Sequence, residues 1–162
     1  MIANIAIIAL VTLSRVVELP KARANARGLI AAGGHEVGAG HYPLIVALHA
    51  TWLLSLWVLA LNRPINLPLL ALFGVVECAR IWVLRTLGRR WTTRIIVVPG
   101  ETLVARGPYK YLNHPNYAVV VAEIALLPLV FGLWQIALIF SVLNAALLTV
   151  RIREENRALG RA

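Results

Sequence analysis

The chain has 162 residues, of which 60% are hydrophobic and 14% charged, and its formal net charge is +9. Because an average soluble domain is only about 45 to 50% apolar, this composition excludes an ordinary soluble protein and indicates an integral membrane protein. The basic residues have no soluble module on which to form a basic face, so nucleic acid is not an expected partner. A single cysteine, Cys78, excludes an internal disulfide bond and a cysteine-rich metal site, and we expect no metal ion.

Five apolar runs predict membrane-spanning helices, because about 20 apolar residues cross the ~30 Å hydrocarbon layer as a helix. The runs comprise residues 1–19, 43–61, 64–84, 117–131 and 134–150. The first lacks the basic region and cleavage site of a signal peptide, so we expect it to be retained. The last two are short and are expected to tilt little or to meet a thinned bilayer. The predicted fold is an all-α, multi-pass bundle of about five transmembrane helices, with residues 1–162 as one domain.

Lysine and arginine are distributed unevenly between the two ends of these runs. Twelve of them flank the ends that share one side of the membrane, and only Arg63 lies on the other side. Since positive residues are retained in the cytoplasm, the asymmetry predicts an external N-terminus, and the charge also favours contact with anionic membrane lipids. The twelve are Lys21, Arg23, Arg27, Arg89, Arg90, Arg94, Arg106, Lys110, Arg151, Arg153, Arg157 and Arg161.

The segment between the third and fourth runs is rich in residues that favour strands and turns. Residues 94–98 are mostly β-branched, Pro99-Gly100 favours a turn, and Gly107-Pro108 interrupts the apolar pattern. We therefore expect an extended excursion on the membrane surface, with glycines that let a ligand approach the backbone.

Two polar clusters flank the last apolar hairpin, which turns at Gly132. The first is RGPYKYLNHPNY, residues 106–117, and the second is RIREE, residues 151–155. Two helices would carry both clusters to the same cytoplasmic face, which is the geometry of a binding site. The first cluster alone is also typical of helix capping, with Pro115 in the first turn and free N–H groups that would suit a carboxylate. The second alone is typical of a solvated ion pair.

At these residues the chain resembles the isoprenylcysteine carboxyl methyltransferase family, integral membrane enzymes that use S-adenosylmethionine. The first family motif is matched by Gly107, Tyr109, His114, Pro115 and Tyr117, with Asn113 in place of an arginine. The second motif is matched by Arg151, Ile152, Glu155 and Leu159, with Asn156 in place of an acid. The resemblance assigns the cofactor-binding part to about residues 87–160.

The resemblance implies a cytoplasmic cofactor pocket lined by Glu101, Thr102, Leu103, Val104, Tyr109, His114, Pro115, Asn116, Tyr117 and Glu155. It implies that Arg151 is catalytic and binds the substrate. Tyrosine faces and an acid attract the sulfonium cation, and Arg151 can hold an acidic oxygen by a charge-assisted hydrogen bond. Glu123 has no local partner in the fourth run, so we expect it to face Arg151 or a substrate tunnel.

The N-terminal third resembles a bacterial branch of the family that is associated with polyketide-type lipids. The resemblance rests on Ser14 to Glu18, on Ala24-Asn25, on GGHEVG at residues 33–38 and on His41-Tyr42. It implies a bacterial inner membrane and an acidic hydroxyl on an alkylated pyrone or phenol as the acceptor. For the glycine-rich residues 28–42, a flexible connection is an equally good interpretation.

Ionisable residues inside the runs usually mark function or pairing, because isolated charges in a bilayer are costly. Glu77 and Arg80 are spaced i and i+3, as are Arg15 and Glu18, so each pair is expected to neutralise itself. Whether the pairs serve structure or function stays open. His49, in an uncharged run, is more typical of a satisfied interior histidine than of a base.

The sequence therefore predicts an S-adenosylmethionine-dependent O-methyltransferase whose lipophilic acceptor carries an acidic oxygen, either a prenylcysteine-like carboxylate or an alkylpyrone or phenol hydroxyl. One alternative is an NADPH-dependent membrane reductase of the sterol reductase type, because such enzymes resemble this family in their C-terminal half. Another is a non-catalytic lipid-binding membrane protein. The identity of the acceptor and the oligomeric state are left open.

Overall fold

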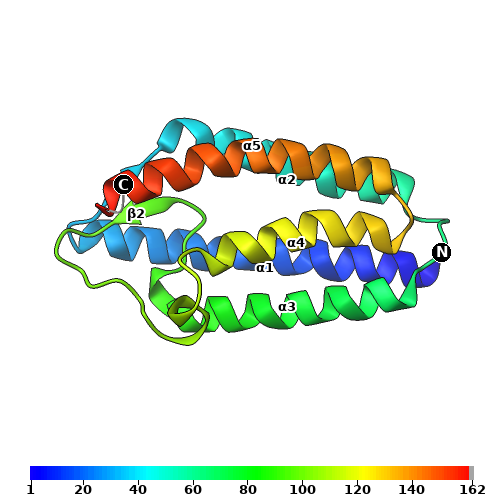
Figure 1. Ribbon diagram of the computed structural model, residues 1–162, viewed down its shortest axis with the longest axis horizontal. Coiled ribbons are helices and arrows are strands. Elements are labelled where there is room, and N and C mark those ends of the chain that lie inside the picture. Colours follow the sequence, from blue (N-terminus) through cyan, green and yellow to red (C-terminus); the bar gives the residue numbers. More distant parts are fainter. Residues whose placement is uncertain (161–162) are drawn as a thin grey trace.

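The computed structural model describes residues 1–160 and shows five α-helices side by side with one small sheet at an end of the bundle (Figure 1). The helices are α1 (Ile2–Ala31), α2 (Tyr42–Leu59), α3 (Leu67–Leu87), α4 (Pro115–Val130) and α5 (Trp134–Ala158). The strands are β1 (His35–Val37) and β2 (Ile95–Val97), and the 3-10 turns are η1 (Ala39–His41), η2 (Gly88–Arg90) and η3 (Gly107–Lys110). The predicted all-α bundle is confirmed.

Helices α1, α2, α3 and α5 are long and apolar enough to cross a membrane, whereas α4 has only 16 residues. Large apolar side chains are exposed on the outer faces, among them Leu10, Val58, Val75 and Val142. Such side chains suit lipid, and helices satisfy their own backbone hydrogen bonds there. The chain is therefore an integral, multi-pass membrane protein. The expectation of a short fifth helix was wrong, because α5 continues to Ala158 and has 25 residues.

The core lies between α1, α2 and α4, where the side chains of Ile8, Leu56 and Leu127 have no exposed surface. Helix α4 packs against both α3 and α5, so the shortest helix lies inside the bundle. The tight turn from α4 to α5 is made at Gly132, whose φ of 70° favours glycine. The hairpin predicted from the sequence therefore exists, and it brings the start of α4 beside the end of α5.

Helix α1 is longer than the sequence predicted, because it continues through Pro20 to Ala31. A proline removes one helical hydrogen bond, but tertiary contacts hold the second half in place. Ala22 is buried, and the Asn25 amide donates to the carbonyl oxygens of Gly88 at 3.1 Å and Trp91 at 2.7 Å. The second half of α1 thus fixes the start of the segment between α3 and α4.

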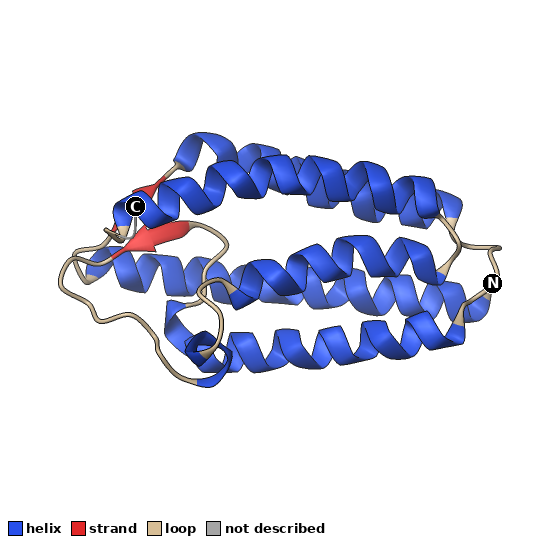
Figure 2. Cartoon of the chain, viewed as in Figure 1, coloured by secondary structure: helices blue, strands red, loops and turns tan. Residues whose placement is uncertain are grey.

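The two strands form an antiparallel pair in which His35 is opposite Val97 and Val37 is opposite Ile95 (Figure 2). The extended excursion after α3 was predicted, but its partner strand in the glycine-rich residues 28–42 was not. Arg94 Nη1 contacts Glu36 Oε2 at 2.7 Å across the strands, and this carboxylate raises the pKa of Arg94. The glycine-rich stretch is therefore one edge of the sheet and not only a flexible connection.

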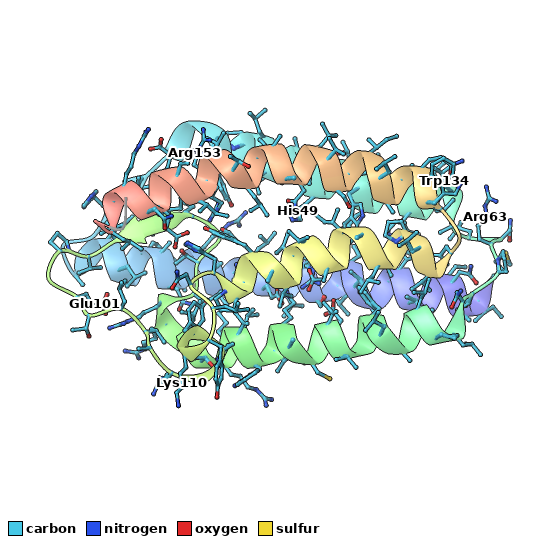
Figure 3. All side chains as sticks on the ribbon, in the orientation of Figure 1. His49, Arg63, Glu101, Lys110, Trp134 and Arg153 are labelled. Atoms are coloured by element: carbon cyan, nitrogen blue, oxygen red, sulfur yellow. The ribbon has the colours of Figure 1, made fainter. Side chains whose placement is uncertain are left out.

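The basic residues that flank the apolar runs lie mainly at one end of the bundle, as the topology prediction requires. Figure 3 shows Arg63 and Trp134 at one end and Glu101, Lys110 and Arg153 toward the other. The ends of α1, α3 and α5 that carry the basic residues lie together beside the sheet. Arg161, counted among these basic residues, lies outside the described residues. Which end faces the cytoplasm stays a prediction.

Candidate functional site

Two cavities meet at the end of the bundle that carries the sheet. The first, here called the polar cavity, has a volume of about 190 Å³ and lies between β2, the segment of residues 101–104 and the start of α4. The second, the apolar cavity, has a volume of about 350 Å³ and lies between α1, α2, α4 and α5. The residues that line both are Trp91, Thr92, Asn116, Tyr117 and Arg151. These five side chains form the boundary between the cavities.

The structure brings together nearly all the residues that the resemblance placed in a cofactor pocket. The polar cavity is lined by Glu101, Thr102, Leu103, Val104, Tyr109, His114, Asn116, Tyr117 and Glu155, together with Arg151. Pro115 is the exception, since it is buried in the first turn of α4 and does not line either cavity. Its role in the described structure is to begin the helix, where its missing N–H has no cost.

Arg151, Tyr117 and Glu155 form a chain of hydrogen bonds from the boundary into the polar cavity. Arg151 Nε donates to the Tyr117 hydroxyl at 2.9 Å, and this hydroxyl donates to Glu155 Oε2 at 2.5 Å. Arg151 Nη2 donates to the carbonyl oxygen of Thr93 at 2.9 Å. These contacts leave Arg151 Nη1 without a hydrogen-bond partner among residues 1–160. A buried, oriented guanidinium with a free nitrogen can bind an acidic oxygen.

His114 is held in place by groups from both ends of the hairpin. Its ring stacks on Tyr117 with 5.3 Å between ring centroids and an interplanar angle of 15°. Its Nε2 lies 3.1 Å from Asn156 Oδ1, and its Nδ1 lies 3.6 Å from Glu155 Oε2. The asparagine that departs from the second family motif therefore positions His114. As the N-cap residue of α4, His114 makes no capping bond with its side chain, so helix capping does not explain it.

The segment of residues 101–104 is held against the cavity by Arg90. Its Nη1 donates to the carbonyl oxygen of Thr102 at 2.6 Å, and its Nη2 lies 2.5 Å from Glu101 Oε1. Tyr109 lines the same cavity, and burial raises the pKa of its hydroxyl, so this group stays neutral and able to donate a hydrogen bond to a higher pH than an exposed tyrosine does. Arg90 was predicted only as a topology signal, and its contacts could not be inferred from the sequence.

Gly107 serves packing and not ligand binding. Its φ is +57°, and a Cβ there would lie 2.7 Å from Oγ1 of Thr86 on α3. The residue does not line the polar cavity. The expectation that this glycine lets a ligand approach the backbone was therefore wrong, because α3 occupies the space beside it.

Glu123 lines the apolar cavity, but the cations that face it do not include Arg151. Arg15 Nη2 lies 3.0 Å from Glu123 Oε1, and Arg80 Nη1 lies 3.1 Å from Glu123 Oε2. Arg80 also contacts Glu18 at 2.5 Å, and Arg15 contacts Glu77 at 2.8 Å. The predicted pairing of Glu77 with Arg80 was wrong, since both side chains find nearer partners on α1 and α4. Arg15 and Glu18 are 3.6 Å apart, within this larger ion network.

Thr93, Tyr42 and Trp91 belong to the site but were not predicted as site residues. The Thr93 carbonyl accepts from Arg151, and its hydroxyl Oγ1 lies 3.0 Å from the Tyr42 hydroxyl. Tyr42 lines the apolar cavity from the start of α2. Its only signal in the sequence was the His41-Tyr42 pair, which the resemblance used as a subgroup signature.

Comparison with known proteins agrees with the position of the two motifs. The model of the isoprenylcysteine carboxyl methyltransferase (ICMT) family matches residues 69–161, which include both polar clusters. The uncharacterized protein YpbQ of Bacillus subtilis (strain 168) is 42% identical over 158 residues, which cover 94% of this chain and 94% of that protein. No solved structure matches the chain.

Proposed function

The chain belongs to the isoprenylcysteine carboxyl methyltransferase family, and from this premise we propose that it methylates an acidic oxygen of a lipophilic acceptor, with S-adenosylmethionine as the methyl donor. The single observation that carries the proposal is that Arg151 and Tyr117 line both cavities. A group bound in the polar cavity and a lipid bound in the apolar cavity would meet there. Such positioning is a large part of catalysis when two reactants must approach in line.

The residues of the polar cavity fit S-adenosylmethionine. The cofactor supplies an electrophilic methyl group on a positively charged sulfur. Glu155 provides a carboxylate, and Tyr109 and Tyr117 provide aromatic rings, both of which attract a cation. Leu103, Val104 and the strand β2 provide apolar surface for the adenosyl part.

The apolar cavity fits the tail of an amphiphile, and Arg151 fits its acidic head. The free Nη1 of Arg151 would hold a carboxylate or an acidic hydroxyl in its anionic form at the boundary. An anionic oxygen needs little help from a base, so the proposed roles of the side chains are to orient the oxygen and to exclude water. This requirement for an anionic oxygen is met by prenylcysteine carboxylates and by alkylpyrone or alkylphenol hydroxyls. We propose that the site faces the cytoplasm of a bacterial inner membrane.

Ligand-dependent unfolding of the purified protein tests the cofactor. S-adenosylhomocysteine at ~100 times its dissociation constant should stabilise the fold by about 2.7 kcal/mol, whereas NADPH should have no effect. Stabilisation by NADPH alone would favour the reductase, and stabilisation by neither would favour a lipid-binding protein.

Transfer of a labelled methyl group to prenylcysteine, alkylpyrone and alkylphenol probes then tests the acceptor. The proposal expects labelled product from at least one of these probes. If none is methylated and a lipid double bond is reduced with NADPH, the proposed function is wrong.

A further inference from the structure

The apolar cavity has polar side chains at two depths. Near the boundary lie Tyr42 on α2, Tyr117 on α4 and Arg151 on α5. His49 follows Tyr42 by seven residues, and Asn144 precedes Arg151 by seven residues, and both line the same cavity. Because α2 runs away from the boundary and α5 runs toward it, both side chains lie roughly 10 Å deeper, two helical turns along. Figure 3 shows His49 near the middle of the bundle.

Packing does not explain the polar side chains at the deeper level. Asn144 is only 4% exposed, and none of the hydrogen bonds among residues 1–160 involves its amide. Two further side chains that line the cavity, Trp52 and Arg15, each have one nitrogen, Nε1 and Nη1, that is buried without a hydrogen-bond partner among residues 1–160. Buried polar groups without partners are costly, and each indicates a missing partner. The deep part of the cavity therefore has hydrogen-bonding capacity that the protein itself does not use.

The neighbouring ion network does not supply these partners. Arg15 and Arg80 are shared among Glu18, Glu77 and Glu123, and each of the three carboxylates contacts at least one guanidinium. His49 Nε2 and the Asn144 amide therefore keep unused hydrogen-bonding capacity at this depth. They come from α2 and α5, which pack against each other.

The bonding of His49 indicates which oxygen would fit. Its Nδ1 lies 2.8 Å from the carbonyl oxygen of Ile45, which can only accept, so Nδ1 carries a proton. In the neutral ring, Nε2 is then an acceptor, whereas the Asn144 amide both donates and accepts. A hydroxyl can donate to Nε2 and accept from the amide. A carbonyl can only accept.

We propose that His49 and Asn144 form a second polar subsite, which binds a hydroxyl group within the tail of the lipid acceptor. The preferred acceptor is then an amphiphile with a hydroxyl roughly 10 Å from the acidic oxygen that Arg151 holds. This inference rests on the proposed function, because it assigns the apolar cavity to the acceptor. The subsite would let the protein distinguish acceptors by their tails, which binding of the acidic head alone does not do.

Equilibrium binding of fatty acids to the purified full-length protein tests the subsite. The probes are octadecanoate, 10-hydroxyoctadecanoate, 10-oxooctadecanoate and, as a control for position, 16-hydroxyoctadecanoate. The wild-type protein should bind the 10-hydroxy acid roughly two- to tenfold tighter than the plain acid, which corresponds to one net hydrogen bond. The 16-hydroxy acid should bind no tighter than octadecanoate. The 10-oxo acid should bind less tightly than the 10-hydroxy acid.

Two variants decide where the preference comes from. Asn144→Leu and His49→Phe should each abolish this preference while octadecanoate still binds. Gln135→Leu, at an exposed position near the start of α5 that lines neither cavity, should retain it. The quantity compared between variants is the ratio of the affinities for the 10-hydroxy acid and for octadecanoate. The different partition of the two probes into detergent cancels in this comparison. If Asn144→Leu does not fold, as judged by unliganded melting, His49→Phe still decides.

Equal binding of the 10- and 16-hydroxy acids to the wild type, or a preference that survives both substitutions, would overturn the subsite. Failure of the proposed function has a different signature. In that case Arg151→Gln leaves octadecanoate binding unchanged and no acceptor is methylated, whatever the tail preference.

Discussion

Arg151 Nε donates a hydrogen bond of 2.9 Å to the hydroxyl of Tyr117, and through it a residue at the end of α5 is tied to the start of α4. The same hydroxyl donates to Glu155, so one oxygen connects the group proposed to hold the acceptor with the group proposed to hold the cofactor. The guanidinium also lies 5.6 Å from the Tyr117 ring centroid, which adds a cation–π contact. Tyr117 is therefore the physical link between the two cavities.

The substitution Tyr117→Phe removes this link and keeps the ring that stacks on His114. We expect both the cofactor affinity and kcat/KM for the acceptor to fall, because Glu155 and Arg151 each lose a partner. One charged hydrogen bond is worth about 1.5 to 3 kcal/mol. Calorimetry and steady-state kinetics measure the two effects. Tyr111→Phe, at an exposed tyrosine outside both cavities, is the control, and a loss confined to one of the two ligands would contradict the link.

Cofactor binding should depend on Glu155 and His114 but not on Glu154. Glu155→Ala and His114→Ala should each weaken S-adenosylmethionine binding while the fold stays intact, since neither truncation opens a core cavity. Glu154 contacts Arg157 at 3.2 Å and does not line the polar cavity, so Glu154→Ala is a matched control one residue away. Calorimetry on detergent-purified variants gives the affinities. Unchanged affinity in both variants would remove these residues from the proposed pocket.

The sequence predicts the local parts of this site well, because its signals are local. The apolar runs specify the helices, and the two polar clusters at the ends of one hairpin must meet when the hairpin closes at Gly132. The interactions that were missed connect distant segments. Nothing in the sequence near residues 35–37 shows that they pair with residues 95–97, and nothing near Arg80 shows that Glu18 lies closer to it than Glu77.

Pro20 is a second case in which a local sequence signal does not predict the effect of distant contacts. Pro20 indicates a helix end, but Asn25 and Ala22 hold the following turns of α1 against the segment after α3. Tertiary contacts decided that boundary, and they depend on residues more than 60 positions away.

The ion network should be important for stability and not only for the site. Arg80 is 8% exposed and contacts both Glu18 and Glu123. Arg80→Ala leaves two carboxylates without this partner inside the bundle, and breaking a buried pair in this way costs about 3 to 5 kcal/mol. Unfolding in detergent measures the loss. Arg85→Ala, at an exposed position on the same helix, should cost far less, and equal losses would show that the network is not the cause.

Cysteine labelling in sealed vesicles tests the topology. In a Cys78→Ser background, a cysteine introduced at Lys110 should react only from the cytoplasmic side, and one introduced at Arg63 only from the external side. The two positions lie toward opposite ends of the bundle (Figure 3). The expectation follows from the twelve-to-one distribution of basic residues. A cysteine at Lys110 that reacts only from outside would reverse the orientation and place the polar cavity on the external face.

The reaction itself should depend most strongly on Arg151. Arg151→Ala should depress turnover strongly while cofactor affinity changes less, because the acidic oxygen of the acceptor loses its ligand and Glu155 keeps the Tyr117 hydroxyl. Arg151→Lys should restore only part of the activity. A lysine provides one ammonium group, whereas the arginine fork binds Tyr117 and Thr93 and still has Nη1 for the acceptor.

Transfer of a labelled methyl group, measured with cofactor titrations on the same variants, separates these effects. Full activity in Arg151→Ala with any acceptor that the wild type methylates would show that another group holds the acidic oxygen. Full recovery by Arg151→Lys would show that only the positive charge matters, and not the planar geometry that joins the two cavities.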